Sequence, residues 1–191
     1  MRRLLVAALT LVATCAAMGA TPKVVQAARV QTQSPVVYDG AYVRIAYPMG
    51  DVPQDRGVCT DVVIRAYRGI GIDLQVLVHE DMRHNFRAYP ALWGLSRPDR
   101  NIDHRRVPNL QKYFERVGAR VPATPTASDY RPGDLVTWML PGNLPHIGIV
   151  SDRKASGTDR PLVIHNIGAG TTEEDMLFAF TMTGHYRFRV E

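Results

Sequence analysis

Apolar and polar residues alternate with the period of an α-helix in three stretches of the chain. The first, over about 59–68, is entered through the loop YPMGDVPQDRGVC and ends at two glycines. The second, over about 74–87, follows Asp73, a residue type that caps helix N-termini. The third, over about 107–117, ends at Gly118. The pattern therefore predicts three amphipathic helices.

The last third of the chain changes to short apolar runs rich in β-branched residues. A turn leads into YRPGDLVTWML, two further runs are HIGIVSD and PLVIHNIG, and the alternating GHYRFRV is expected to close the sheet. Helices first and strands later predict an α+β domain with a mostly antiparallel sheet. Residues 21–37 lack such a pattern, so we expect a flexible lead-in there and a single domain over 38–191.

The first 20 residues have the layout of a secretory signal, with MRR followed by LLVAALTLVATCAAMGA. Cleavage can fall after residue 19 or 20, or as late as residue 28. An uncut membrane anchor is one alternative. Lipoprotein processing at Cys15 is another, although Thr14 is bulky for the position before a lipidated cysteine. No later apolar run reaches 18 residues, so we expect no stable membrane span after signal removal. The signal itself predicts a periplasmic or cell-envelope protein.

Export changes how the charge and the cysteines are interpreted. The formal net charge is +5, and removal of residues 1–28, with three basic residues and no acidic one, leaves a mildly basic chain. No basic run interleaved with aromatic residues is present, so we expect no nucleic-acid partner. Cys59 then has no partner within the chain, and an odd thiol in an exported protein indicates either intermolecular pairing or reactivity.

Cys59 stands at the start of the first predicted helix, where unpaired N–H groups and the helix dipole favour a thiolate. The alternative is a small buried cysteine that packs like an alanine. A cysteine nucleophile needs a base, and the base needs an orienting group. His146 opens one predicted strand and His165 ends the next, so both rings are candidates at one edge of the sheet.

These residues resemble a known pattern. DYRPGDLVTWMLPGNLPHIGIVSD is similar to a segment of NlpC-type cell-wall cysteine peptidases, in which a PGDL strand precedes a strand that carries the base. The resemblance implies a papain-like fold, with Cys59 as nucleophile, His146 as base and His165 as orienting residue. It also implies that Tyr47, in YPMG, lies near the oxyanion. This chain departs from the family in having GVCTD in place of DCSG, and in a longer interval between the cysteine and the base.

Over residues 42–187 the order of several strings, among them VIHNIGAG, resembles an uncharacterised family of exported bacterial proteins placed near these peptidases. The resemblance and the export signal imply a cysteine hydrolase that cleaves an amide bond in the peptide part of peptidoglycan, or another amide substrate, without a cofactor. The alternatives are an acyltransferase on the same fold and a non-catalytic envelope binding protein. The oligomeric state stays open.

Other candidates are weaker. His79 and His84 are five residues apart, whereas ligands on one helix face need a spacing of three or four, so we expect no metal site there. The string NIDHRR is read as a salt-bridged loop, or alternatively as a cleft wall in which arginine recognises a carboxylate. The tryptophans Trp93 and Trp138 are expected in the core or a cleft. IGAGTTEED lacks the lysine of a nucleotide-binding loop.

Overall fold

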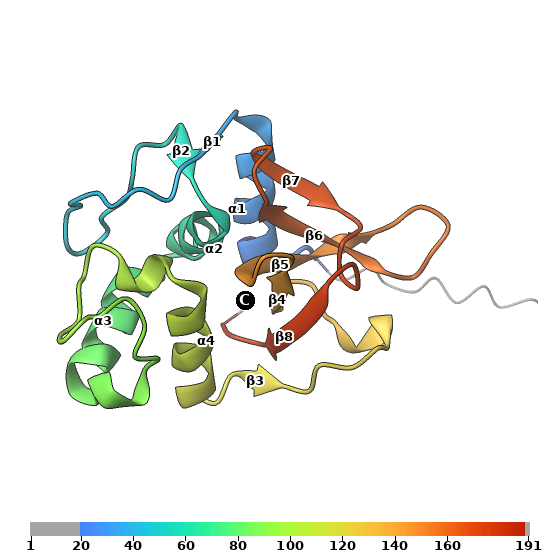
Figure 1. Ribbon diagram of the computed structural model, residues 1–191. Helices are drawn as coiled ribbons and strands as arrows, with labels where there is room; N and C mark the ends of the chain where they lie inside the picture. The colour runs from blue at the N-terminus through green and yellow to red at the C-terminus, as the bar shows by residue number, and fades with distance from the viewer. Residues whose placement is uncertain (1–19, 190–191) are drawn as a thin grey trace, which may run out of the picture.

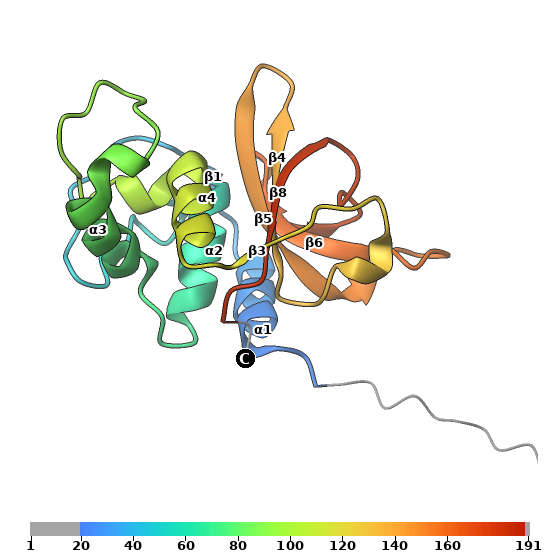
Figure 2. The ribbon, with the colours of Figure 1, turned by 90° about the horizontal axis from the view of Figure 1, so that it is seen from below.

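The computed structural model describes residues 20–189, in which helices form one layer and strands the other (Figures 1 and 2). The helices are α1 (Lys23–Val30), α2 (Cys59–Arg68), α3 (Leu74–Asn85) and α4 (Val107–Arg116), with a short 3-10 turn, η3 (Asp103–Arg105), before α4. Figure 2 shows α2, α3 and α4 grouped on one side of the strands, with α1 lying between α2 and the sheet.

The main sheet is antiparallel, with the strand order β3-β8-β4-β5-β6-β7. Its strands are β3 (Arg120–Val121), β4 (Leu135–Leu140), β5 (Leu144–Lys154), β6 (Pro161–Asn166), β7 (Thr171–Glu174) and β8 (Thr181–Tyr186). Two short strands, β1 (Val37–Tyr38) and β2 (Arg56–Gly57), pair in parallel beside the start of α2 (Figure 1).

Side chains of the sheet alternate between two apolar clusters, because successive residues of a strand point to opposite faces. Ile147, Ile149 and Ile164 pack with the helices in one cluster. Val150 and Val163 join Trp138 in the second cluster, on the face turned away from the helices. The strands are therefore buried on both sides, which explains why they read as nearly continuous apolar runs.

The three predicted helices and the strands predicted at β4, β5 and β6 are confirmed, whereas GHYRFRV overlaps β8 only in its first three residues. The three helices begin at or near the predicted residues, and Asp73 caps α3 by accepting a hydrogen bond from the backbone of Gln75 at 2.9 Å. The α+β class with an antiparallel sheet is also confirmed. Strand β7 was missing from the prediction, because TTEE is short, polar and preceded by a glycine-containing loop.

The expectation of a flexible lead-in over residues 21–37 is wrong. Residues 23–30 form α1, whose Val24, Val25 and Ala28 are fully buried against the rest of the helical layer. Arg29 at its end binds Glu173 at 2.9 Å, which ties α1 to β7. Residues 1–19, with nearly all of the expected signal and Cys15, lie outside the described residues. Within residues 20–189 no helix is long and apolar enough to cross a bilayer.

Candidate active site

Cys59 is the first residue of α2 and has a free thiol that is 4% exposed. The carboxylate of Asp61, two residues further on, accepts a hydrogen bond from the backbone N–H of Val58 at 2.7 Å. An acidic side chain in the first turn satisfies an amide that the helix leaves unpaired and complements the helix dipole. The turn that presents the thiol is therefore defined by its own sequence, VCTD.

A buried ion pair anchors this turn to the loop before α4. Arg105 donates two hydrogen bonds to Asp61, at 2.8 and 2.9 Å, and both side chains are 2% exposed. Thr60 adds a hydrogen bond from its hydroxyl to the backbone oxygen of Arg105 at 3.0 Å. The interpretation of NIDHRR as a salt-bridged segment is confirmed. A two-pronged guanidinium–carboxylate contact is directional, so it holds the start of α2 in one orientation.

Backbone donors face the thiol, yet the thiol is not acidic. Burial raises the pKa of Cys59 to about 11, and the charge of Asp61 also raises it. The N–H groups of Ile147, Thr60 and Cys59 itself act in the opposite direction. The helix start was expected to favour a thiolate, but here desolvation outweighs the helix N-terminus, so the thiol is neutral at pH 7.

Tyr38 of β1 lies beside the thiol. Burial first, and then the neighbouring Cys59 thiol, raise the pKa of the Tyr38 phenol to about 12. The phenol is therefore a neutral hydrogen-bond donor next to the sulfur at physiological pH. No motif in the sequence pointed to this tyrosine.

The two predicted histidines lie together on neighbouring strands. Nε2 of His146 on β5 is 2.9 Å from Nδ1 of His165 on β6. Nε2 of His165 is in turn 2.8 Å from a carboxylate oxygen of Glu174 on β7. The three side chains form a chain of hydrogen bonds that runs from a buried imidazole to a half-exposed carboxylate. Glu174 was not identified from the sequence, although TTEED contains the acid.

Both histidines are neutral at pH 7. Burial lowers the pKa of His146 to about 3, and the repulsion that a protonated His165 would exert is the second cause. Burial also lowers the pKa of His165, while Glu174 acts against that shift. A neutral imidazole can accept a proton, and a bond at Nε2 leaves Nδ1 of His146 as its second ring nitrogen.

The thiol and the imidazole belong to different faces of the sheet. Ile147, next to His146, packs with Cys59 on the helix side, whereas His146 contacts Trp138 on the other side, with 5.9 Å between ring centroids. Among the hydrogen bonds of the described residues, none joins the Cys59 sulfur to either histidine. Backbone pairing between β5 and β6 begins only at Ile149, so the strands are unpaired beside the thiol.

The structure places Tyr47 away from Cys59. Its hydroxyl donates to Glu80 of α3 at 2.9 Å, and its ring packs edge-on against His79, with 5.3 Å between centroids. His84, the other histidine of α3, is exposed and contacts the backbone oxygen of Glu80 at 2.8 Å. Residues 20–189 contain no group of three ligand-type side chains arranged to hold a metal ion.

A cavity of about 330 Å³ lies next to the start of α2. Val58, Tyr42 and the stacked pair of Trp93 and Arg106 are among the residues that line it, and the Arg106 guanidinium lies 4.1 Å from the ring centroid of Trp93. This half-exposed tryptophan is thus a cavity wall, while Trp138 is fully buried. A small ligand in the cavity would lie against Val58, the residue that precedes Cys59 in the chain.

Comparisons with known proteins support a family assignment. A model of a domain of unknown function, DUF1287, matches residues 25–188, which include most of α1 and all six strands of the main sheet. The uncharacterized protein YijF of Escherichia coli (strain K12) is 59% identical over 165 residues, covering 86% of this chain and 80% of that protein. No solved structure matches, and neither match links the chain to NlpC-type peptidases. The chain therefore belongs to the DUF1287 family.

Proposed function

We propose that the chain is an exported bacterial cysteine hydrolase with a papain-like fold that cleaves an amide bond in the peptide part of peptidoglycan. The observation that carries this proposal is the placement of a free thiol at the start of α2, against the backbone of the residue that follows His146. The resemblance of the PGDL and HIGIV segments to NlpC-type peptidases supplies the reaction class and the substrate class.

In the proposed reaction, the Cys59 sulfur attacks the amide carbonyl while its proton passes to Nδ1 of His146. The carbon–nitrogen bond breaks, and the departing amine takes that proton. Water then hydrolyses the thioester with the same imidazole as base, which restores the thiol. Because the His146 ring and the Cys59 sulfur lie on different faces of the sheet, the transfer requires a movement that brings Nδ1 of His146 to the sulfur.

Three features favour this assignment of roles. His165 binds Nε2 of His146, which leaves Nδ1 for the thiol proton, and Glu174 fixes the tautomer of His165. The backbone N–H groups beside the sulfur are donors for a developing oxyanion. Tyr38 takes the place that the resemblance gave to Tyr47, because its phenol lies beside the thiol.

A digest of purified muropeptides analysed by mass tests the hydrolase directly. We expect the folded chain to add one water to a stem peptide and release an amine, and we expect Cys59→Ala and His146→Gln to abolish the product. His84→Gln is the matched control, since it removes an exposed histidine from α3. Intact stem peptides after prolonged incubation with folded protein would overturn the hydrolase. Products joined to an added amine would indicate acyl transfer, which shares the thioester.

A second candidate is a non-catalytic envelope binding protein. The observation that favours it is the burial of Cys59, which leaves a neutral thiol with 4% exposure. In that case Cys59→Ala would bind muropeptides as the wild-type chain does, and neither protein would turn them over. Loss of turnover with retained binding in Cys59→Ala alone supports the hydrolase.

A further inference from the structure

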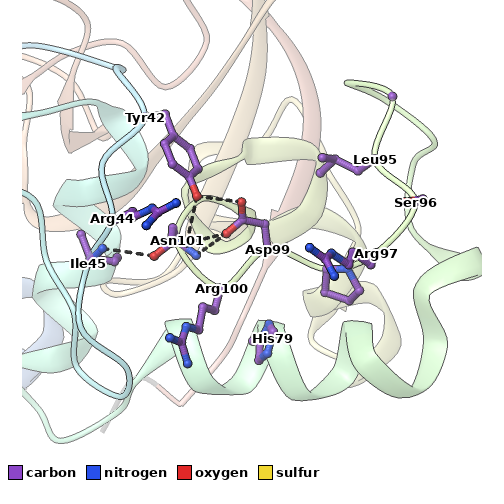
Figure 3. Close-up of a pocket in the computed structure, with 12 residues that line it drawn as sticks. Tyr42, Arg44, Ile45, His79, Leu95, Ser96, Arg97, Asp99, Arg100 and Asn101 are labelled. Carbon is purple, nitrogen blue, oxygen red and sulfur yellow. Dashed lines mark hydrogen bonds between the residues drawn. The ribbon is translucent and has the colours of Figure 1, made fainter.

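A second and larger cavity, of about 720 Å³, lies between α3 and two loops (Figure 3). The 42–45 segment forms one wall, His79 of α3 forms another, and the 94–101 loop closes the rest. Its volume is in the range of pockets that hold small ligands. Neither the nucleophile nor the histidine pair of the candidate active site lines it.

Three arginines surround this cavity. Figure 3 shows the side chains of Arg44, Arg97 and Arg100 on different sides of it. Among residues 20–189, none of these three guanidiniums has a carboxylate or other hydrogen-bond partner, although Arg100 lies 5.6 Å from the ring centroid of Tyr47. Most other arginines of the described residues hold carboxylates, as Arg105 holds Asp61, and Arg87, Arg131 and Arg189 are the exceptions. The arginines around the cavity are therefore available to an anion from outside.

The acidic side chain of this cavity is already engaged. Asp99 accepts hydrogen bonds from the hydroxyl of Tyr42 at 3.0 Å and from the side chain of Asn101 at 2.8 Å (Figure 3). It holds the loop in shape and pairs with none of the three guanidiniums. Three positive charges and one negative charge leave the lining with an excess of two positive charges.

The histidine of the lining has an unmet polar atom. Nδ1 of His79 is buried and has no hydrogen-bond partner. Burial lowers the pKa of His79, so the ring is neutral at pH 7 and adds no charge to the lining.

We propose that this cavity binds a ligand that carries two carboxylates. Guanidinium groups bind carboxylates through two parallel hydrogen bonds. Arg44 comes from the 42–45 segment, and Arg97 and Arg100 come from the 94–101 loop, so guanidiniums face the wide cavity from two segments (Figure 3). This arrangement suits two separated carboxylates better than one compact phosphate. Tyr42 lines both this cavity and the smaller one beside Val58. The identity of the ligand rests on the proposed hydrolase function. Under that function, the ligand is the acidic end of the substrate peptide.

Titration calorimetry on the full chain with Cys59→Ala tests the site without interference from turnover. The probe is N-acetyl-Ala-Glu-Ala with a free C-terminus, and its neutral counterpart is N-acetyl-Ala-Gln-Ala amide. We expect the acidic peptide to bind at least tenfold more tightly than the neutral one. Arg97→Gln and Arg100→Gln should each weaken the acidic peptide at least tenfold, and Arg160→Gln, whose arginine pairs with Asp175 elsewhere, should change nothing.

Equal affinity for the two peptides would overturn the proposal, as would no binding at millimolar concentration or no effect of the arginine substitutions. Inorganic phosphate that binds the same site more tightly than the peptide would overturn the choice of carboxylates. Thermal melting of each variant shows that it is folded. A peptide that binds here while the wild-type chain leaves muropeptides intact counts against the hydrolase alone, so the two proposals fail separately.

Discussion

Nε2 of His146 and Nδ1 of His165 lie 2.9 Å apart, and this hydrogen bond joins β5 to β6 beside the point where their backbone pairing ends. Glu174 extends the contact to β7 at 2.8 Å. The side chains thus connect three neighbouring strands, β5, β6 and β7, near the end of the paired region of β5 and β6. The proposed chemistry and the expected dependence of stability on pH follow from this arrangement.

The buried histidines predict a loss of stability in acid. A histidine whose pKa is lower in the folded than in the unfolded chain contributes stability above its unfolded pKa of about 6.5. For His146 that contribution is lost as the pH falls from there toward about 3, at up to about 1.4 kcal/mol per pH unit. We expect urea titrations to show a shallower acid loss in His146→Gln than in the wild-type chain.

His84→Gln, at an exposed position on α3, is the control and should leave the acid dependence unchanged. Burial also lowers the pKa of His104, to about 4, so part of the acid loss will persist in His146→Gln. The same pH dependence in wild type and His146→Gln would show that His146 does not gain a proton on unfolding.

The buried pair of Asp61 and Arg105 is expected to dominate the stability of the α2 start. Asp61→Ala leaves the Arg105 charge buried without its carboxylate, so the free energy of unfolding should fall by about 3–5 kcal/mol. Arg83→Ala removes one partner from an ion pair with Glu80 whose side chains are 58% and 40% exposed, so it should change the free energy of unfolding far less. Urea denaturation of both variants measures the contrast. Similar losses would contradict an anchoring role for Asp61.

Helix α1 should behave as part of the core. Val25 is fully buried, whereas Val30 at the end of the same helix is 63% exposed. We expect Val25→Ala to lower the free energy of unfolding by about 2 kcal/mol, and Val30→Ala to change it by less than about 0.5 kcal/mol. An equal, small effect of both substitutions would mean that α1 does not pack as the structure shows.

The Cys59 thiol should be alkylated slowly at neutral pH. With its pKa raised to about 11 by burial, the fraction of thiolate grows about tenfold for each pH unit above 7. We expect the rate of reaction with iodoacetamide to follow that rise, while the same chain unfolded in urea levels off above a pKa of about 8.5. A plateau below pH 8 in the folded chain would contradict a neutral buried thiol.

The sequence was sufficient to predict the helices and strands that have a clear hydrophobic period or a capping residue. The helix after Asp73 and the strands that hold His146 and His165 follow from local pattern alone. α1 was missed although Val24, Val25 and Ala28 have helical spacing, because the polar residues around them concealed it. The ion pair between Asp61 and Arg105 could not be predicted from the sequence, because 44 positions separate the two residues and only the packing of η3 on α2 brings them together.

The same contrast holds for the candidate site. The contact between His146 and His165 was predicted from two strands ending at one edge, and the structure brings the rings together. The state of the Cys59 thiol was not predictable, because it depends on how completely the folded chain excludes water from the sulfur. Tyr38 and Glu174 carry no local motif and are recognised only through their neighbours in space.

In the proposed reaction Cys59 attacks an amide carbonyl with His146 as base. Mass spectrometry of the folded chain incubated with a peptide that carries a chloromethyl ketone at the scissile position tests it most directly. We expect one label per chain, on Cys59, formed at least 100-fold more slowly in a folded His146→Gln variant. Equal labelling rates in the two proteins, or no label on Cys59 of the folded wild-type chain, would contradict it.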